Sequence, residues 1–220
     1  IDMFIHYSAF DIKLLYYTPL DVAIEAALTC TSTDNRLEEY KLNKEEFLLK
    51  LLKSGHESVF EHLTYTFKIK NISRALLQEL ARHRHISLSV MSTRYALKKE
   101  LSNNNTSLTF KLPNFSANNQ QQVEAYNNLL NVLTKAEEAV INAVDAGIKN
   151  DVLKYFIPES LVTKLVLTVN CRELRHIFNL RLSNRALEEF RHLCLNIYNV
   201  IPDDHKFLYS DIINNYGGDL

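Results

Sequence analysis

The residues best suited to chemistry lie in a single run, positions 82–94, which reads RHRHISLSVMSTR. Guanidinium, imidazole and hydroxyl groups are concentrated there, directly after an apolar helical segment. An arginine offers five fixed N–H donors that match phosphate and carboxylate oxygens, and its charge is permanent. In a chain of net charge -1, such a cluster favours a site for an anionic ligand, with a solvated basic loop as the alternative.

Apolar residues interleave with this run and indicate that it is half buried. Ile86, Leu88, Val90 and Met91 are spaced among the polar positions. A buried guanidinium without a counter-anion is costly, and a bound anion relieves that cost. Because one charge-assisted hydrogen bond contributes about 1.5–3 kcal/mol, two or three arginines could anchor a nucleotide.

The scarcity of glycine limits how a nucleotide could be held. Only Gly55, Gly147, Gly217 and Gly218 occur, so the chain has neither a G-x-G-x-x-G turn nor a P-loop. Side chains must then hold the phosphates, and arginine is the natural choice. Nine of the ten arginines fall within positions 74–94 and 172–191, which suggests one composite anion site.

Two further segments combine histidine with charged residues. Positions 56–62 read HESVFEH, with histidines six apart rather than the four of a zinc-protease helix. A polar turn, a ligand-contacting turn or a metal site would each fit, and no metal ligand set is predicted. In positions 170–176, NCRELRH, Arg172 and His176 share one face of a helix. Ion pairs such as Glu173 with an exposed arginine are the alternative there.

Hydrophobic periodicity predicts the elements that must position these residues. Residues 62–70 alternate apolar and polar, which predicts a half-buried strand. Residues 162–169 fit a strand or the start of a helix, and their β-branching favours a strand. The other predicted elements are a strand or strand pair at 3–17, helices after Pro19, at 43–55, after Ser73, and at 118–147, 171–182 and 184–200, and a loop or variable insertion at 100–118.

The composition predicts a soluble globular protein, and the mixture of predicted strands and helices, without a linker or repeat, predicts one α+β domain over residues 1–220. Hydrophobic residues make up 46% and charged residues 23%, which are ordinary globular values. With 25 basic and 26 acidic residues, a bulk electrostatic role on nucleic acid or membrane is disfavoured. No membrane-spanning run or signal peptide is evident. Three widely spaced cysteines without a C-x-x-C pair indicate a reducing compartment, so the expected location is cytoplasmic.

Three blocks of the chain resemble the flavin-dependent thymidylate synthases. Arg82-His83-Arg84, followed after seven residues by Ser92, resembles their R-H-R-x7-S signature. Positions 55–62, GHESVFEH, are similar to the family's G-H-x-S/T-x-x-E-H turn, and Asn170-x-Arg172 with Leu180-Arg181 is similar to its N-x-R…L-R block. The blocks occur in the family's order and spacing, over roughly residues 10–95 and 145–195.

The resemblance implies a fold, an assembly and a reaction. The fold is α+β, a mostly antiparallel sheet flanked by helices that include one long helix. The assembly is a homotetramer with sites shared between subunits. The reaction is reductive methylation of dUMP to dTMP, with methylenetetrahydrofolate as carbon donor, FAD and NADPH as hydride source, and tetrahydrofolate as product. It needs no cysteine nucleophile.

The resemblance also assigns residues to ligands. Arg181 and Ser92 are the expected catalytic residues, although a nucleophilic Ser92 is disfavoured because a serine needs an adjacent base. Arg181 would lie against the N3–C4–O4 edge of uracil and make C5 more nucleophilic, while Ser92 and Arg94 would hold the phosphate. The FAD positions are His56, Ser58, Glu61, Arg82, His83, Arg84, Val90, Asn170, Arg172 and His176, and the dUMP positions are Glu79, Arg82, Val90, Met91, Ser92, Thr93, Arg94, Lys154 and Arg181.

Four positions depart from the family pattern. Lys154 stands where many members carry arginine and loses the bidentate geometry of a guanidinium. Arg185 replaces a frequent histidine, Val90 replaces a longer polar residue, and His85 adds an imidazole beside the motif. A non-catalytic, diverged member of the family is therefore one alternative. The other is a nucleotide- or RNA-binding module that uses the arginines and eleven tyrosines.

Overall fold

The computed structural model describes residues 3–103 and 107–216 and confirms an α+β fold, an antiparallel sheet flanked by helices. The strands are β1 (Phe4–His6), β2 (Asp11–Tyr17), β3 (Thr64–Ser73), β4 (Ile86–Val90), β5 (Phe110–Leu112) and β6 (Val162–Asn170). The helices are α1 (Asp21–Thr31), α2 (Leu37–Lys41), α3 (Lys44–Lys53), α4 (Arg74–Leu80), α5 (Thr93–Asn103), α6 (Gln120–Asp145), α7 (Asn150–Leu153), α8 (Cys171–Arg181), α9 (Glu188–Val200) and α10 (Ser210–Tyr216). Short 3₁₀ helices cover Asp34–Arg36, Glu57–His62, Lys154–Phe156 and Asp203–Tyr209.

The chain divides into two compact units that are interleaved in sequence. The first unit contains residues 1–9, 70–80 and 90–165, and the second contains residues 10–69, 81–89 and 166–220. The four-stranded sheet has the order β2-β3-β6-β4, and β1 pairs with β5 in parallel. The single domain predicted over residues 1–220 stays a prediction.

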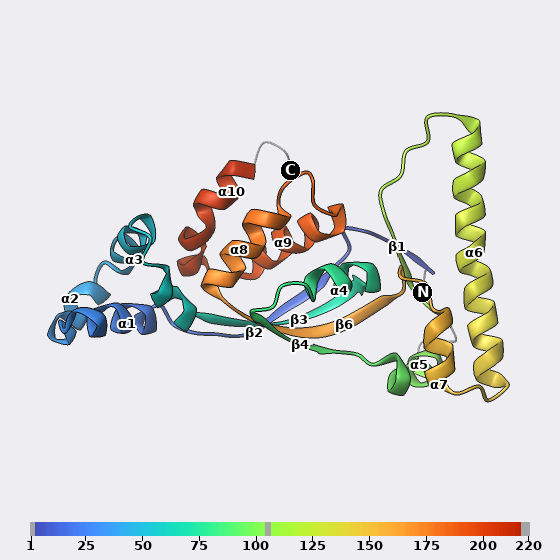
Figure 1. The fold of residues 1–220 in the computed structure, drawn as a ribbon, viewed down its shortest axis with the longest axis horizontal. Coiled ribbons are helices and arrows are strands. Elements are labelled where there is room, and N and C mark those ends of the chain that lie inside the picture. Colours follow the sequence, from blue (N-terminus) through green and yellow to red (C-terminus); the bar gives the residue numbers. More distant parts are fainter. Residues whose placement is uncertain (1–2, 104–106, 217–220) are drawn as a thin grey trace. The chain divides into compact units, whose positions relative to one another are not determined.

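The first unit contains the long helix α6, which confirms the helix predicted at 118–147 (Figure 1). The Asn119 side chain accepts a hydrogen bond from the Gln122 amide, 2.9 Å away, and Gly147 follows the helix with a φ of 81°. A buried cluster of Leu97, Leu101, Leu108, Phe110, Val140, Leu153 and Leu161 joins α6 to α5, α7 and β5. The loop predicted at 100–118 is therefore wrong for the end of α5 and for β5, while residues 104–106 lie outside the description.

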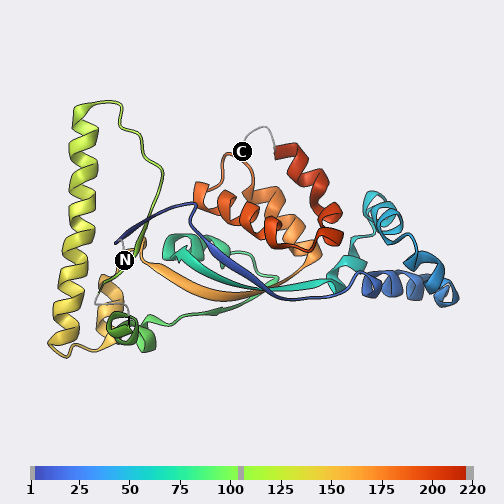
Figure 2. The ribbon, with the colours of Figure 1, turned by 180° about the vertical axis from the view of Figure 1, so that it is seen from behind.

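The second unit carries the side chains of the predicted half-buried strand. Leu63, Tyr65, Phe67 and Ile69 are fully buried, as the alternation at 62–70 predicts. Figure 1 and Figure 2 show α8, α9 and α10 covering one face of the sheet in this unit. One side of β3 carries polar side chains and the other carries apolar, buried ones. The core of this unit therefore lies between the sheet and these helices.

Capping explains where several helices begin. The Ser73 hydroxyl accepts a hydrogen bond from the Leu76 amide at 3.0 Å, as predicted for the start of α4. Asn170 caps α8 through the Glu173 amide at 2.8 Å. Asn43 precedes α3 as predicted, but its side chain makes no cap hydrogen bond. Among the helices that the structure describes, none combines the length and apolar character needed to cross a bilayer.

Candidate functional site

The Arg82–His85 segment, in the turn before β4, points its side chains in opposite directions. His83 is buried, with 6% of its surface exposed, whereas Arg82, Arg84 and His85 are exposed. The sequence argument that buried arginines need an anion is therefore wrong for Arg82 and Arg84, because solvent already covers them. The interleaved apolar positions of β4 are partly buried, as predicted.

His83 lies at the centre of a network formed with α8 and α9. The Arg181 Nε–H donates a hydrogen bond to His83 Nε2 at 3.0 Å, and His83 Nδ1 lies 3.5 Å from a carboxylate oxygen of Glu173. The Arg181 guanidinium stacks over the Phe190 ring, 4.8 Å from its centroid. The His176 ring is 6.2 Å from that of His83.

Burial and the neighbouring cation keep His83 neutral. Loss of solvent lowers the pKa of His83 below its usual range, and the Arg181 charge lowers it further. Glu173 acts in the opposite direction, and His176 in the same direction as Arg181. A neutral imidazole can accept the Arg181 hydrogen bond, whereas a protonated one has only donors.

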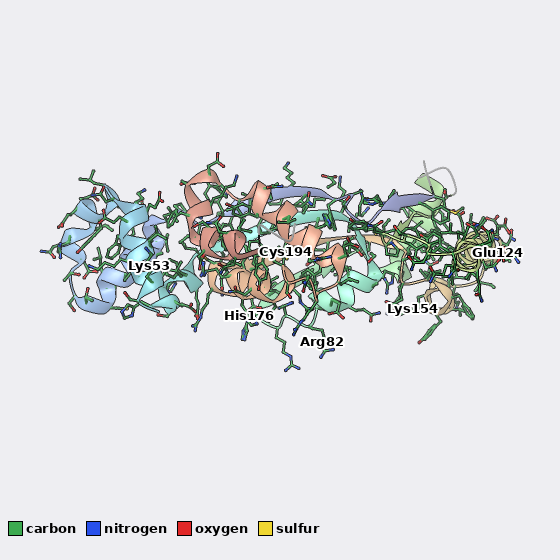
Figure 3. All side chains as sticks on the ribbon, turned by 90° about the horizontal axis from the view of Figure 1, so that it is seen from above. Lys53, Arg82, Glu124, Lys154, His176 and Cys194 are labelled. Atoms are coloured by element: carbon green, nitrogen blue, oxygen red, sulfur yellow. The ribbon has the colours of Figure 1, made fainter. Side chains whose placement is uncertain are left out.

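A polar cleft of about 740 Å³ lies along α8, next to the 3₁₀ helix Glu57–His62. Arg172 lies there with its Nη1 atom 2.7 Å from Glu61 and its Nε atom 3.3 Å from Glu57. Figure 3 shows His176 and Arg82 pointing outward from the same side of this unit. The lining residues are Glu57, Glu61, His85, Asn170, Arg172, Glu173, Arg175, His176 and Asn179.

The geometry favours a hydrogen-bonding network over a metal centre. His83, Glu173 and His176 have potential ligand atoms within 4.8 Å of one another. However, both ring nitrogens of His83 already face Arg181 and Glu173. A guanidinium 3.0 Å from a histidine nitrogen would also repel a cation bound there.

The residues expected to bind the nucleotide lie mainly in the first unit. Arg94, at the start of α5, pairs with Asp151, with Nε 2.5 Å from Oδ1, and its carbonyl accepts a hydrogen bond from Asn150. The guanidinium lowers the pKa of Asp151. Thr93 is buried and Ser92 partly buried, whereas Glu79 and Lys154 are exposed. A hollow of about 280 Å³ is lined by Arg94, Lys98, Lys149, Asn150 and Asp151.

Some predicted residues come together, and others are placed elsewhere. Glu61, Asn170, Arg172 and His176 share the cleft of the second unit, with His83 and Arg181 in the adjoining network. His56 instead borders a separate hollow of about 360 Å³ beside α3. Ser58 is exposed, and Val90 and Met91 belong to the first unit together with Ser92.

Sequence reasoning missed Glu173 and Phe190. Glu173 is buried near His83 and does not pair with an exposed arginine as the sequence suggested. The carboxylates that pair with the exposed Arg172 are those of Glu57 and Glu61. A signal for Glu173 existed, because it lies four residues before the buried Ile177 and therefore on the buried face of α8. His85, which had no account, lines the cleft.

Two of the three cysteines, Cys171 and Cys194, are buried, and Cys30 is exposed. Cys30, Cys171 and Cys194 are all free thiols. Burial raises the pKa of Cys171 to about 12 and raises that of Cys194 as well. Because the thiolate is the nucleophilic form, the two buried cysteines are poorly suited to attack a substrate.

Fold and site together define a class of protein. It is an α+β protein without a glycine-rich loop, whose polar cleft is lined by arginine, histidine and glutamate side chains. Residues 13–204 match the family described as thymidylate synthase complementing protein. The flavin-dependent thymidylate synthase of Campylobacter jejuni strain RM1221 is 39% identical over 205 residues, covering 92% of this chain and 97% of the relative. The chain therefore belongs to the flavin-dependent thymidylate synthase family.

Further relatives agree along nearly the whole chain. The flavin-dependent thymidylate synthase of Helicobacter pylori strain 26695 is 35% identical over 203 residues, covering 91% of this chain and 97% of the relative. A crystal structure of thymidylate synthase X (ThyX) from Helicobacter pylori, described with FAD and dUMP, superposes with a TM-score of 0.74. That match is 32% identical and covers 92% of this chain and 99% of the other.

Proposed function

We propose that this protein methylates dUMP to dTMP, with methylenetetrahydrofolate as carbon donor and NADPH as reductant. The observation that carries the proposal is the match to flavin-dependent thymidylate synthases over 92% of the chain, including a structure described with FAD and dUMP. FAD, when bound, supplies the hydride chemistry. The residues of this chain then have to bind the two ligands, orient them and activate the uracil ring.

The donor set of the cleft fits a dinucleotide cofactor. Its volume of about 740 Å³ falls within the range of small-molecule sites. Arg172 brings a permanent charge for a diphosphate, and His176 and Asn170 offer hydrogen-bonding groups to polar parts of a cofactor. We assign these residues to FAD together with the other cofactor positions expected from the family, His56, Ser58, Glu61, Arg82, His83, Arg84 and Val90.

Arg181 is our candidate for activating the substrate. Its guanidinium is held on two sides, by the hydrogen bond to His83 and by the Phe190 ring. The hydrogen bond to His83 is donated by Nε rather than by a terminal amino group. A cation fixed at the uracil edge stabilises negative charge on O4 and so makes C5 more nucleophilic. Because the cation is already in place, it does not have to be reoriented when that charge develops.

Arg94 and Ser92 are our candidates for the phosphate end of dUMP, and Glu79, Arg82, Val90, Met91, Thr93 and Lys154 are candidates for other contacts with dUMP. Asp151 competes for Arg94, because its carboxylate already occupies the guanidinium. Replacing Asp151 by Asn should therefore tighten dUMP binding by about two- to fivefold, the range of an exposed ion pair. Asp145→Asn, an exposed change at the end of α6, is the control. An unchanged dUMP Kd by calorimetry would argue against Arg94 as a phosphate ligand.

Tritium release from C5-labelled dUMP tests the proposed reaction directly. The purified protein should be yellow with flavin absorbance, and release should require both NADPH and methylenetetrahydrofolate. A colourless protein that neither binds added FAD nor turns over would contradict the proposal. Retained FAD without turnover would instead favour a non-catalytic member of the family. Gel filtration tests the proposed homotetramer, and mixing two inactive variants tests whether subunits share sites.

A further inference from the structure

The buried network suggests a role for Glu173, which lies outside the residues expected from the family motifs. We infer that Glu173 is a positioning residue: its carboxylate holds His83 as the Nδ1–H tautomer, and His83 Nε2 then holds the Arg181 guanidinium in place. Only side chains of the second unit take part, from the turn before β4 and from helix α8. The kinetic part of this inference rests on the proposed function of Arg181.

The tautomer follows from the hydrogen-bond donors. Arginine has N–H donors and no acceptor. The 3.0 Å contact from Arg181 Nε therefore requires a lone pair on His83 Nε2. In a neutral imidazole the proton must then reside on Nδ1, and Nδ1 faces the Glu173 carboxylate at 3.5 Å. Arg181 and Glu173 thus demand the same tautomer from opposite sides of the ring.

Burial makes this arrangement selective. The side chains of His83 and Glu173 are 5% and 10% exposed, so water competes weakly for either ring nitrogen. The Asn170 cap fixes the backbone of Glu173 at the first turn of α8. A partner that fixes the tautomer of a histidine lets the other nitrogen act reliably. Without the carboxylate, the ring could take the Nε2–H tautomer, whose proton would face the Arg181 donor and break the contact.

The Glu173 position can be tested with a pair of variants that differ in acceptor rather than size. Glu173→Gln keeps an oxygen that can accept the Nδ1 proton, while Glu173→Leu removes it. We expect Glu173→Leu to lower kcat by about 10- to 100-fold, as for other partners that orient a histidine, with FAD retained and a smaller change in the KM for dUMP. Glu173→Gln should restore most of kcat. Glu137→Leu, which removes a buried glutamate of the first unit, controls for lost stability alone.

The pH profile separates positioning from a structural role. The charged or titratable groups facing His83 are Arg181, Glu173 and His176, and Phe190 of α9 covers it without a charge. Protonation of His83 at low pH would place a proton on Nε2 and break its contact with Arg181. Because Glu173→Gln removes the carboxylate that favours protonation, the acid limb of its kcat profile should move to lower pH. An unmoved limb would contradict the inference.

Neutron diffraction of the FAD-bound protein decides the tautomer without relying on turnover or on a variant that folds. A deuteron on His83 Nδ1 with none on Nε2 is the expected result, and a deuteron on Nε2 would overturn the inference. Equal kcat for Glu173→Leu and the wild type would also overturn it. If no tritium is released by any form, the proposed function fails, while the neutron map still decides what Glu173 does to His83.

Discussion

His83 and His205 are two buried histidines of the second unit with different surroundings. His83 is 6% exposed and His205 is fully buried, and burial lowers the pKa of both below the usual range. His83 has a cation on one nitrogen and a carboxylate near the other. His205 Nδ1 instead contacts the Tyr65 hydroxyl at 2.8 Å, and its ring meets those of Tyr17 and Tyr65 edge-on.

The difference in surroundings matches the roles that we propose, His83 in the candidate site and His205 in the core. Charged partners around His83 orient a guanidinium next to an open polar cleft. The His205 ring contacts the rings of Tyr17 and Tyr65, with Asp204 as a charged neighbour in sequence, and its Nε2 has no hydrogen-bond partner among the described residues. Burial and a lowered pKa alone therefore do not identify a functional histidine. The charged groups that face both nitrogens of His83 are what set it apart from His205.

Changing the arginine of the His83 network should produce the largest effect on turnover. Arg181→Ala removes the cation proposed to activate uracil, and kcat should fall by about 10²–10³-fold, as for other fixed donors at a developing negative charge. The protein should still fold and bind FAD, because the cleft residues are unchanged. Steady-state tritium release with C5-labelled dUMP measures the loss. Arg36→Ala, an exposed arginine paired with Glu39, is the control, and near-wild-type rates for Arg181→Ala would mean that another group activates the substrate.

Removing the hydrogen-bond partner of His205 should lower the stability of the protein and leave kcat unchanged. Tyr65→Phe removes the hydroxyl that contacts His205 Nδ1 and leaves a buried polar atom without a partner. The free energy of unfolding should fall by about 1–3 kcal/mol, while kcat stays unchanged. Urea unfolding followed by fluorescence measures the change, with Tyr16→Phe, an exposed tyrosine of β2, as the control. If Tyr65→Phe lowered kcat without lowering stability, His205 would also affect the site, and the proposed difference between the two histidines would be wrong.

Local patterns in the sequence predicted most of the elements. The alternation at 62–70 gives β3, and the long amphipathic stretch before Gly147 gives α6. Both patterns arise from residues that are close to one another in the sequence. The segment 100–118 was harder, because β5 forms by pairing with β1, about a hundred positions earlier. A three-residue strand has little pattern of its own, and a distant partner supplies the hydrogen bonds that define it.

The candidate site shows the same division between local and distant information. The motif resemblance pointed to His83 and Arg181, which the structure joins by a hydrogen bond. The burial of His83 between exposed Arg82 and Arg84 could not be read from the residues, since it depends on packing against Phe190 and α8 about ninety positions downstream. Glu173 was missed for the same reason. A charge on the buried face of a helix predicts a partner, but not which one.

The pH dependence of stability should give the smallest effect and the finest test of the comparison. In the unfolded chain His205 has the ordinary histidine pKa of about 6.5, whereas in the folded protein burial lowers it. Below about pH 6.5 the unfolded chain therefore binds more protons, so the free energy of unfolding falls as the pH falls. His83, with its pKa also lowered, contributes in the same direction, and a single proton accounts for at most about 1.4 kcal/mol per pH unit.

Replacing His205 by Phe should remove the contribution of His205 to the pH dependence of the free energy of unfolding. The contribution of His83 should remain. Urea unfolding between about pH 8 and about pH 5 measures both slopes, and His62→Gln, an exposed histidine, should leave the wild-type slope unchanged. The kcat of His205→Phe should keep the wild-type pH profile, because this ring contacts neither Arg181 nor the cleft residues in the described structure. Equal stability slopes for His205→Phe and the wild type would mean that His205 is not the proton-linked group. A shifted kcat profile would mean that the core histidine also acts on the site.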